Sequence, residues 1–244
     1  MFDHVTILVA DRAASERFYD TVLETLGIDK SYRTNTISEW RDFMVTAADD
    51  EHPVTRRLHI GFVAPDHGRV EAFWRAGVDA GYTDDGRPGP RPESGEDYYG
   101  GFLLDPDGNS AEASHHGNLR RNAGIVDHLW IRVADLGKSR AFYDTIAPAA
   151  GLSQDHDTAD RVQYRGDTGS FSLLPGDPTE YLHMAFPTRD DGAVRRFHEA
   201  ATNAGYRSNG EPGERARYHA GYYAAFVLDP DENNIELVNH HRDQ

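Results

Sequence analysis

The sequence predicts an α+β protein made of two tandem modules, each containing two β-α-β-β-β units. Three observations support this: a hairpin motif that occurs twice, a constant displacement between repeated residues, and an alternation of strand and helix patterns. The motif GFLLDPDGNSAE at residues 101–112 returns at residues 225–236 as AFVLDPDENNIE. Each copy predicts a strand, a tight turn with proline at its first central position, and a second strand that carries a glutamate.

The repeated glutamate shares its displacement of 124 residues with two repeated histidines. The three pairs are His4 and His128, His59 and His183, and Glu112 and Glu236. A displacement that holds for three separate segments indicates a tandem duplication. We therefore expect one module at residues 1–117, a linker at 118–124 and a second module at 125–244, each large enough to bury its own core.

The first unit of each module begins with a strand and continues with a helix. Residues 4–10 alternate between two faces, and residues 13–26 place Phe18, Val22 and Leu26 at helical spacing before Gly27. The corresponding segments of the second module are residues 128–134 and 136–151. Strands at residues 40–46 and within 161–174 complete these units.

The second unit of each module repeats this order. Leu58 opens a strand, and a helix is expected over residues 68–80; residues 182–204 repeat the pair. Residues 82–97 are rich in glycine and proline and predict a long loop. Glu232 occupies the hairpin-turn position of Gly108, where a positive φ would cost a residue other than glycine about 1–2 kcal/mol.

The composition excludes several classes of function. The chain has 41 acidic and 25 basic residues and a formal charge of −16, which argues against nucleic acid as a partner. It has no cysteine, so disulfides, thiolate–metal sites and cysteine nucleophiles are excluded. No apolar run reaches membrane-spanning length and the N-terminus does not resemble a signal peptide. We expect a soluble cytoplasmic protein with no membrane partner, as a monomer or a homodimer.

Two imidazoles and one carboxylate, present twice, predict metal binding. These residue types form the facial triad, which holds a divalent metal on one face and leaves the opposite positions open. Zinc is also bound by two histidines and a glutamate. The candidate metal ligands are His4, His59, Glu112, His128, His183 and Glu236.

The segments around these ligands resemble the metal-bearing strands of the vicinal oxygen chelate superfamily. The segments begin at Asp3-His4 and Leu58-His59 and include Asp105-Pro-Asp-Gly-Asn109, and the resemblance covers nearly all of both modules. This group includes glyoxalase I, extradiol dioxygenases, fosfomycin-resistance transferases and metal-free bleomycin-binding proteins. It implies the glyoxalase/dioxygenase-like fold, in which each module forms an open, curled, mixed β-barrel with flanking helices. It also implies one site of His4, His59 and Glu112, and a second of His128, His183 and Glu236.

Departures from the family patterns narrow the function. Glyoxalase I uses a fourth, carboxylate ligand, and neither residues 43–46 nor residues 171–174 offer one. Six retained ligand positions count against pure sequestration. The three-ligand pattern resembles that of ring-cleaving dioxygenases and of fosfomycin-type transferases, although ring-cleaving enzymes usually have longer modules and keep a metal in only one of them. We therefore expect a metal-dependent enzyme that binds a small substrate through chelating oxygens, with a lean towards a dioxygenase.

Alternatives remain open for the metal and for the reaction class. Fe(II) or Mn(II) is expected, with Zn(II) or Ni(II) as the alternative. A glyoxalase-like lyase or isomerase, or a resistance-type transferase, would use the same metal site without needing oxygen. A sequestering protein would bind its ligand without a metal and release it unchanged.

Further residues are candidates for the two pockets. Strand alternation places Thr6 and Leu8 beside His4, and Trp130 and Arg132 beside His128. Arg132 would favour an anionic substrate if its side chain faces inward. The alternative is that its side chain reaches the surface. His116 and His240, four residues beyond the two glutamates, either line the far ends of the pockets or are solvated strand ends.

Two tyrosines and one histidine complete the catalytic candidates. The pair Tyr98-Tyr99 recurs as Tyr222-Tyr223, and one ring of each pair should face the metal. From these pairs we select Tyr99 and Tyr223, which would hydrogen-bond a substrate oxygen or act as acids. His219, whose counterpart is Gly95, is a candidate acid–base residue of the second module only. Arg132 is the fourth catalytic candidate.

Overall fold

The computed structural model describes residues 1–92, 94–116 and 124–241, which form four repeats of one β-α-β-β-β unit. The first unit comprises β1 (His4–Val9), α1 (Arg12–Leu23), β2 (Tyr32–Arg33), β3 (Ile37–Trp40) and β4 (Phe43–Ala47). The second comprises β5 (Leu58–Val63), α2 (His67–Asp79), β6 (Thr83–Pro90), β7 (Tyr98–Leu104) and β8 (Ser110–His116). The third comprises β9 (Val126–Val133), α3 (Leu136–Ala150), β10 (Ser153–Asp157), β11 (Val162–Arg165) and β12 (Ser170–Pro175). The fourth comprises β13 (His183–Pro187), α4 (Asp191–Asn203), β14 (Ser208–Glu214), β15 (Tyr223–Leu228) and β16 (Asn234–Asn239).

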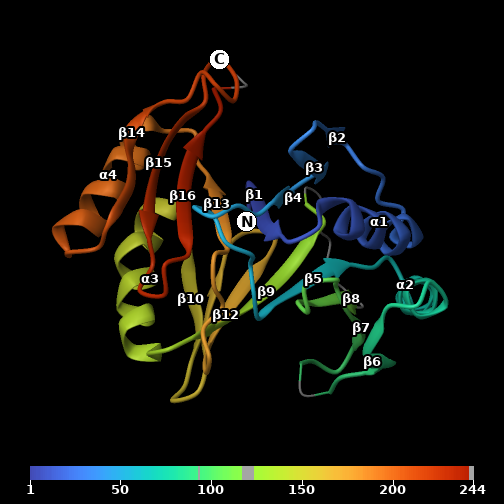
Figure 1. The fold of residues 1–244 in the computed structure, drawn as a ribbon. Helices are drawn as coiled ribbons and strands as arrows, with labels where there is room; N and C mark the ends of the chain where they lie inside the picture. The colour runs from blue at the N-terminus through green and yellow to red at the C-terminus, as the bar shows by residue number, and fades with distance from the viewer. Residues whose placement is uncertain (93, 117–123, 242–244) are drawn as a thin grey trace.

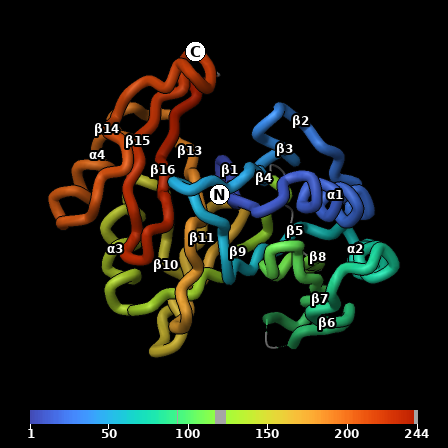
Figure 2. Tube along the Cα trace, in the orientation of Figure 1, coloured from blue at the N-terminus to red at the C-terminus, as the bar shows by residue number. Residues whose placement is uncertain are grey.

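The units combine into two open, mixed sheets of eight strands, and each sheet takes one unit from each half of the chain. One sheet has the order β14-β15-β16-β13-β1-β4-β3-β2, and the other β10-β11-β12-β9-β5-β8-β7-β6. The halves join where β1 pairs antiparallel with β13 and where β5 pairs antiparallel with β9. The first and last units therefore lie side by side (Figure 1), as the Cα trace also shows (Figure 2). The α+β class and the repeated units are confirmed, but the sheets cross between the modules.

Each pair of packed helices comes from one module, whereas each sheet combines strands from both modules. Helix α1 packs on α2, and α3 packs on α4, so each pair lies on its own side of the molecule (Figure 1). Helix α1 begins at Asp11, whose side chain accepts a hydrogen bond from the Ala14 N–H. A short 3-10 turn (Glu24–Leu26) extends it to Gly27, which has a φ of 75°. The expected helix end at Gly27 is thus confirmed.

The repeated Asp-Pro-Asp hairpin is tied into the core by its own side chains. Asp105 accepts hydrogen bonds from the N–H groups of Asp107 and Asn109, and from the buried hydroxyl of Tyr19 on α1 at 3.0 Å. Asn109 accepts from the Leu58 N–H and donates to the Thr55 carbonyl, each at 3.1 Å. The hairpin therefore fixes the start of β5, the strand that carries His59. Tyr143, Asp229 and Asn233 repeat this arrangement in the other half.

Three expectations about connections have different outcomes. The long loop expected at residues 82–97 is wrong in part, because Thr83–Pro90 is strand β6, paired antiparallel with β7 through two register shifts. As an edge strand, β6 tolerates the prolines that led to the loop prediction. Glu232 has a φ of 71° where Gly108 has 83°, as expected for this turn. The linker expected at 118–124 lies outside the described residues except for Gly124.

In the described part of the chain, the helices are too short or too polar to cross a lipid bilayer.

Candidate metal centres

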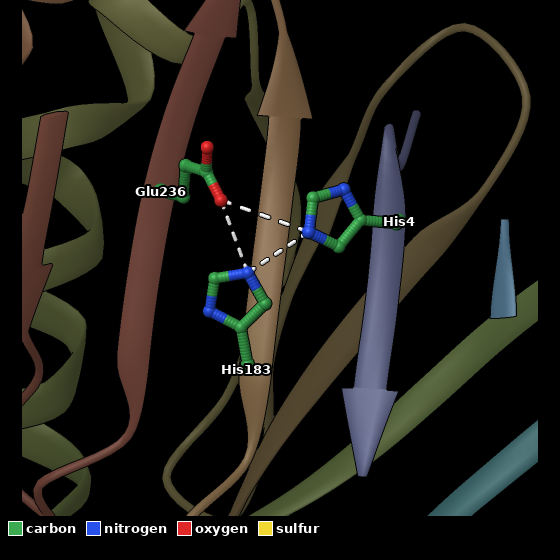
Figure 3. A group of neighbouring side chains, drawn as sticks. All are labelled: His4, His183 and Glu236. Carbon is green, nitrogen blue, oxygen red and sulfur yellow. Dashed lines mark hydrogen bonds and ion pairs between the residues drawn. The ribbon is translucent and has the colours of Figure 1, made fainter. Parts of the chain in front are cut away.

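The first triad consists of His4 on β1, His183 on β13 and Glu236 on β16. The Nε2 atoms of the two histidines lie 3.0 Å apart. Oε2 of Glu236 lies 3.6 Å from Nε2 of His4 and 3.1 Å from Nε2 of His183. Figure 3 shows the three side chains pointing at one another from three adjacent strands. Three donor atoms thus converge on one point above the sheet.

The second triad consists of His59 on β5, Glu112 on β8 and His128 on β9. Its two Nε2 atoms lie 3.2 Å apart, and Oε2 of Glu112 lies 3.0 Å from that of His59 and 3.2 Å from that of His128. The six candidate ligands therefore fall into two groups of three whose donor atoms all lie within 4.8 Å of one another.

Both triads have the donor set and the spacing that a divalent metal requires. Donors bound at about 2.0–2.2 Å lie about 3.0 Å apart at right angles and about 3.4 Å apart in a tetrahedron. The observed separations of 3.0–3.6 Å and 3.0–3.2 Å match that range. Two imidazoles and one carboxylate also suit iron, manganese and zinc alike. The residues therefore fit a metal, and the donor set alone does not select which one.

The grouping of the ligands differs from the one that the resemblance implied. His4 was expected with His59 and Glu112, but it lies with His183 and Glu236, and His128 takes the place of His4 beside His59. The cause is the strand pairing between the halves, since β1 lies next to β13 and β9 lies next to β5. Each candidate centre is thus built across both halves of the chain.

A second layer of hydrogen bonds orients the ligands of the first triad. Nδ1 of His4 lies 2.8 Å from the carboxylate of Asp3, which in turn accepts from Nε2 of His240 at 2.8 Å. Tyr222 donates its hydroxyl hydrogen to Oε1 of Glu236 at 2.6 Å, leaving Oε2 directed at the histidines. A carboxylate on the outer nitrogen favours the imidazole tautomer whose Nε2 lone pair can bind metal. His240 is therefore a supporting residue and not a solvated strand end.

The second triad has the same supporting layer. Asp127 lies 2.7 Å from Nδ1 of His128 and 3.1 Å from Nε2 of His116. Tyr98 donates to Oε1 of Glu112 at 2.8 Å. The duplication has kept this layer at both sites, which indicates that it belongs to the ligand geometry and not to the surface.

Burial and the carboxylates act in opposite directions on the triads. Burial lowers the pKa of His128, but hydrogen bonds to Asp127 and Glu112 outweigh it and raise that pKa to about 9. Burial raises the pKa of Glu112, and hydrogen bonds with His128 and His59 reverse this and hold the pKa at about 2. Burial lowers the pKa of His183. In the second triad a metal would take the position of the His128 proton beside a carboxylate that is already ionised.

The first triad lies at the floor of a cavity of about 1250 Å3. Thr6 and Leu8 line it as the strand alternation predicts, and Ile37, Met44 and Phe226 add further apolar surface. The polar wall contains Glu39, His219, and Arg215 and Arg217 of the segment before β15. The open side of the triad therefore faces a space large enough for a small-molecule substrate.

Two of the catalytic candidates point away from the triads. The Tyr99 hydroxyl lies 3.3 Å from Glu71 on α2, and the Tyr223 hydroxyl lies 3.2 Å from Arg195 on α4. Selecting these tyrosines was wrong, because Tyr98 and Tyr222 occupy the inward positions. The register shows why: Tyr98 pairs with His116 and Phe102 with Glu112, so these four residues share one face. Counting back from the hairpin turn could have identified Tyr98.

The remaining candidates separate into near and distant residues. Trp130 lies beside the second triad, its ring centroid 5.5 Å from that of His59. Arg132 is exposed, and its side chain lies along Gly176, so it does not join the triad. His219 lies 2.8 Å from His240 and lines the cavity of the first triad. Asp3 and Asp127, which sequence reasoning missed as supporting residues, were signalled only by directly preceding a repeated histidine.

Replacing Gly61 by alanine is expected to weaken metal binding at the second triad about 10–100-fold, the effect typical of disturbing a ligand's support. A Cβ at Gly61 would lie 2.3 Å from Cε1 of His128, so the imidazole has to move. The measurement is competition with a chelating indicator, with the first triad disabled by His4→Ala. The matched control is Ala185→Gly beside His4, which adds only space and is measured with the second triad disabled by His128→Ala. An unchanged affinity in Gly61→Ala would show that His128 is not a ligand.

Comparisons with known proteins agree with this architecture. Residues 1–113 match the family model described as the Glyoxalase/Bleomycin resistance protein/Dioxygenase superfamily. Glyoxalase I from Zea mays is 18% identical, with a TM-score of 0.70 over 98% of this chain and 92% of its own. A candidate dioxygenase from Bacillus subtilis is 15% identical, with a TM-score of 0.64 over 98% of this chain and 85% of its own. At these identities the likeness shows the fold alone. No curated protein sequence shows significant similarity to the chain.

Proposed function

We propose that the chain belongs to the Glyoxalase/Bleomycin resistance protein/Dioxygenase superfamily, whose family model matches residues 1–113, and that it is a metal-dependent enzyme. It binds a small substrate with chelating oxygens at the first triad. One observation carries the proposal: the donor atoms of His4, His183 and Glu236 converge at the floor of a cavity of about 1250 Å3. Three protein ligands on one side leave the cavity side for substrate.

The ligands are expected to hold Fe(II) or Mn(II), with Zn(II) or Ni(II) as the alternative. When bound, the ion supplies Lewis acidity towards substrate oxygens and, if redox-active, a means of using dioxygen. The absence of a fourth carboxylate on β4, whose sequence is FMVTA, favours a dioxygenase over a glyoxalase I type of site. Glu39 on β3 lines the same cavity, pairs with Met44 and accepts a hydrogen bond from Ser31.

The chain's own residues bind and orient the substrate. Thr6, Ile37 and Phe226 provide a largely apolar wall that would pack against the carbon skeleton. Asp3 and Tyr222 hold the ligands in place, so little reorganisation is needed when substrate binds.

His219 is our candidate for proton transfer at this site. A chain of hydrogen bonds, each 2.8 Å long, links it through His240 and Asp3 to His4. Nδ1 of His219 also lies 2.8 Å from the Ala220 carbonyl, which can only accept. With the Asp3 carboxylate accepting at the other end, the two histidine rings form a continuous hydrogen-bonded path between these two acceptors. This path would carry a proton to or from the cavity.

Among the described residues only the first triad has this route, because the residue that corresponds to His219 at the second triad is Gly95. Replacing His219 by glycine, the residue at the matching position, is expected to lower turnover about 10²–10⁴-fold, as for loss of an acid–base group. Metal content should stay unchanged, because His219 contacts no ligand. Turnover within a factor of about three of the wild type would remove His219 from the mechanism.

The proposed function is tested by metal analysis and oxygen uptake. Protein purified without oxygen or chelator is assayed for metal and then given catechols and 1,3-diketones with an oxygen electrode. Consumption of oxygen that is lost in His4→Ala supports the dioxygenase. Turnover without oxygen and with zinc or nickel would indicate a lyase, isomerase or transferase instead. Metal-independent binding of a ligand that is released unchanged would replace the enzyme by a sequestering protein.

A further inference from the structure

The second triad is flanked by more aromatic rings than the first triad. The ring of Trp130 lies 5.5 Å from that of His59 and 6.4 Å from that of His128, centroid to centroid. The ring of Phe102 lies 5.8 Å from that of His59. Trp130 keeps 36% of its surface exposed and the His59 side chain 19%, so the rings and the ligand can be reached from solvent.

Each of these rings has a guanidinium over it. Arg161 lies 5.6 Å from the centroid of Trp130 and is held there by a 3.1 Å hydrogen bond from its Nε to the hydroxyl of Ser172. Arg91 lies 5.1 Å from the centroid of Phe102. Among the residues that the structure describes, neither guanidinium forms an ion pair with a carboxylate. Arg161 thus stands beside the second triad with capacity to bind an anion, whereas Arg91 donates to the Pro90 and Arg87 carbonyls and has a counterpart at the first triad in Arg215, which lies 5.4 Å from the centroid of Phe226.

The corresponding wall of the first triad has a different character. At a displacement of 124 residues, Thr6 corresponds to Trp130, Ile37 to Arg161, and Glu39 to Gln163. The strand pairings are the same at both sites, since Glu39 pairs with Met44 on β4 and Gln163 with Ser172 on β12. The first triad therefore has a carboxylate and an aliphatic side chain where the second has an amide and a guanidinium. At these positions an anion would be repelled by Glu39 in the first wall and attracted by Arg161 in the second.

We propose that the second triad is a separate binding site that selects a flat aromatic anion, such as an aryl carboxylate with a neighbouring oxygen. The ring of the ligand would lie against Trp130, its charge beside Arg161, and its oxygens towards His59, Glu112 and His128. Planar π-systems and guanidinium groups recognise such ligands by stacking and by paired hydrogen bonds. Binding of the ligand's oxygens rests on the proposed function, because it needs the metal. The contacts of the ligand with Trp130 and Arg161 do not need the metal.

The probe is salicylate, whose binding is followed by quenching of tryptophan fluorescence and by calorimetry, in metal-loaded and metal-free protein. Trp40 is fully buried but Trp74 is half-buried, so the quenching that belongs to Trp130 is identified by its loss in Trp130→Thr. We expect about one salicylate per chain, with salicylamide and cyclohexanecarboxylate each bound about tenfold more weakly. Arg161→Ile should weaken salicylate about tenfold and leave salicylamide unchanged, while Arg161→Lys recovers part of the loss.

The duplication supplies matched variants. Trp130→Thr and Arg161→Ile give the second wall the residues of the first, and Thr6→Ser, Ile37→Val and Glu39→Gln alter the first wall alone. Salicylate affinity should fall in the former set and stay unchanged in the latter. Equal affinity in Arg161→Ile and wild type, loss only in the first-wall variants, or no binding at all would overturn the proposal. A protein that binds no metal but still shows Arg161-dependent quenching by salicylate would contradict the proposed enzyme function. It would leave the proposal of this binding site standing.

Discussion

The double variant His4→Ala/His59→Ala is expected to bind no metal, whereas His4→Ala/His183→Ala should keep about one ion per chain. The reason is the pairing of β1 with β13 and of β5 with β9, which distributes the ligands of each triad over both halves. The first variant removes one histidine from each triad, and the second removes two from the same triad. The measurement is metal content per chain after anaerobic reconstitution and gel filtration.

The control for this experiment is His59→Ala/His128→Ala, which empties the second triad and should also retain about one ion. The grouping implied by the resemblance predicts the reverse ranking, with His4→Ala/His59→Ala retaining one ion and His4→Ala/His183→Ala retaining none. Retention of metal by His4→Ala/His59→Ala would therefore contradict the crossed arrangement of the strands. A wild-type chain without metal would contradict the metal assignment itself.

Replacing Asn233 by alanine is expected to lower the free energy of unfolding by about 3–5 kcal/mol, as each buried polar group left unpaired costs about 1–3 kcal/mol. Asn233 is fully buried. Its Oδ1 accepts from the Leu182 N–H at 2.9 Å, and its Nδ2 donates to the Thr179 carbonyl and to Asp229 at 3.1 Å. Urea unfolding followed by circular dichroism measures the change.

Asn35→Ala serves as the control, because Asn35 is exposed in the turn before β3 and should change stability by no more than about 0.5 kcal/mol. Asn109→Ala, the matching substitution in the other hairpin, should be as destabilising as Asn233→Ala. Because Asn233 fixes the residue before His183, the first triad should also lose metal affinity. A loss below about 1 kcal/mol would mean that water replaces the three hydrogen bonds.

The sequence identifies the six candidate ligands but not their grouping. The displacement of 124 residues relates His4 to His128 and His59 to His183, and both possible groupings obey it equally. Choosing between them requires knowing whether β1 lies beside β5 or beside β13. That is a matter of long-range strand pairing, which depends on the complementarity of whole faces and leaves no mark in local periodicity. The helices and hairpins, which depend on neighbours in sequence, were predictable for the same reason.

The inward tyrosines show a different limit. Tyr98 and Tyr99 differ only in strand phase, and the phase is set by the pairing of β7 with β8 across the hairpin turn. Without that register, either ring can be assigned to the metal side. Edge strand β6 was missed because its prolines and glycines match a loop, although an unpaired edge accommodates them.

The crossing of the sheets between the halves has a consequence for how the two centres can change. A single half cannot complete a triad, so an unfused ancestor would have needed two identical copies related by a twofold axis. In such an assembly every substitution appears at both centres at once. Joining the copies in one chain removes that constraint. Trp130 could then arise at the position that corresponds to Thr6, and His219 at the position that corresponds to Gly95. The covalent link thus makes possible a division of labour that a symmetric pair could never have.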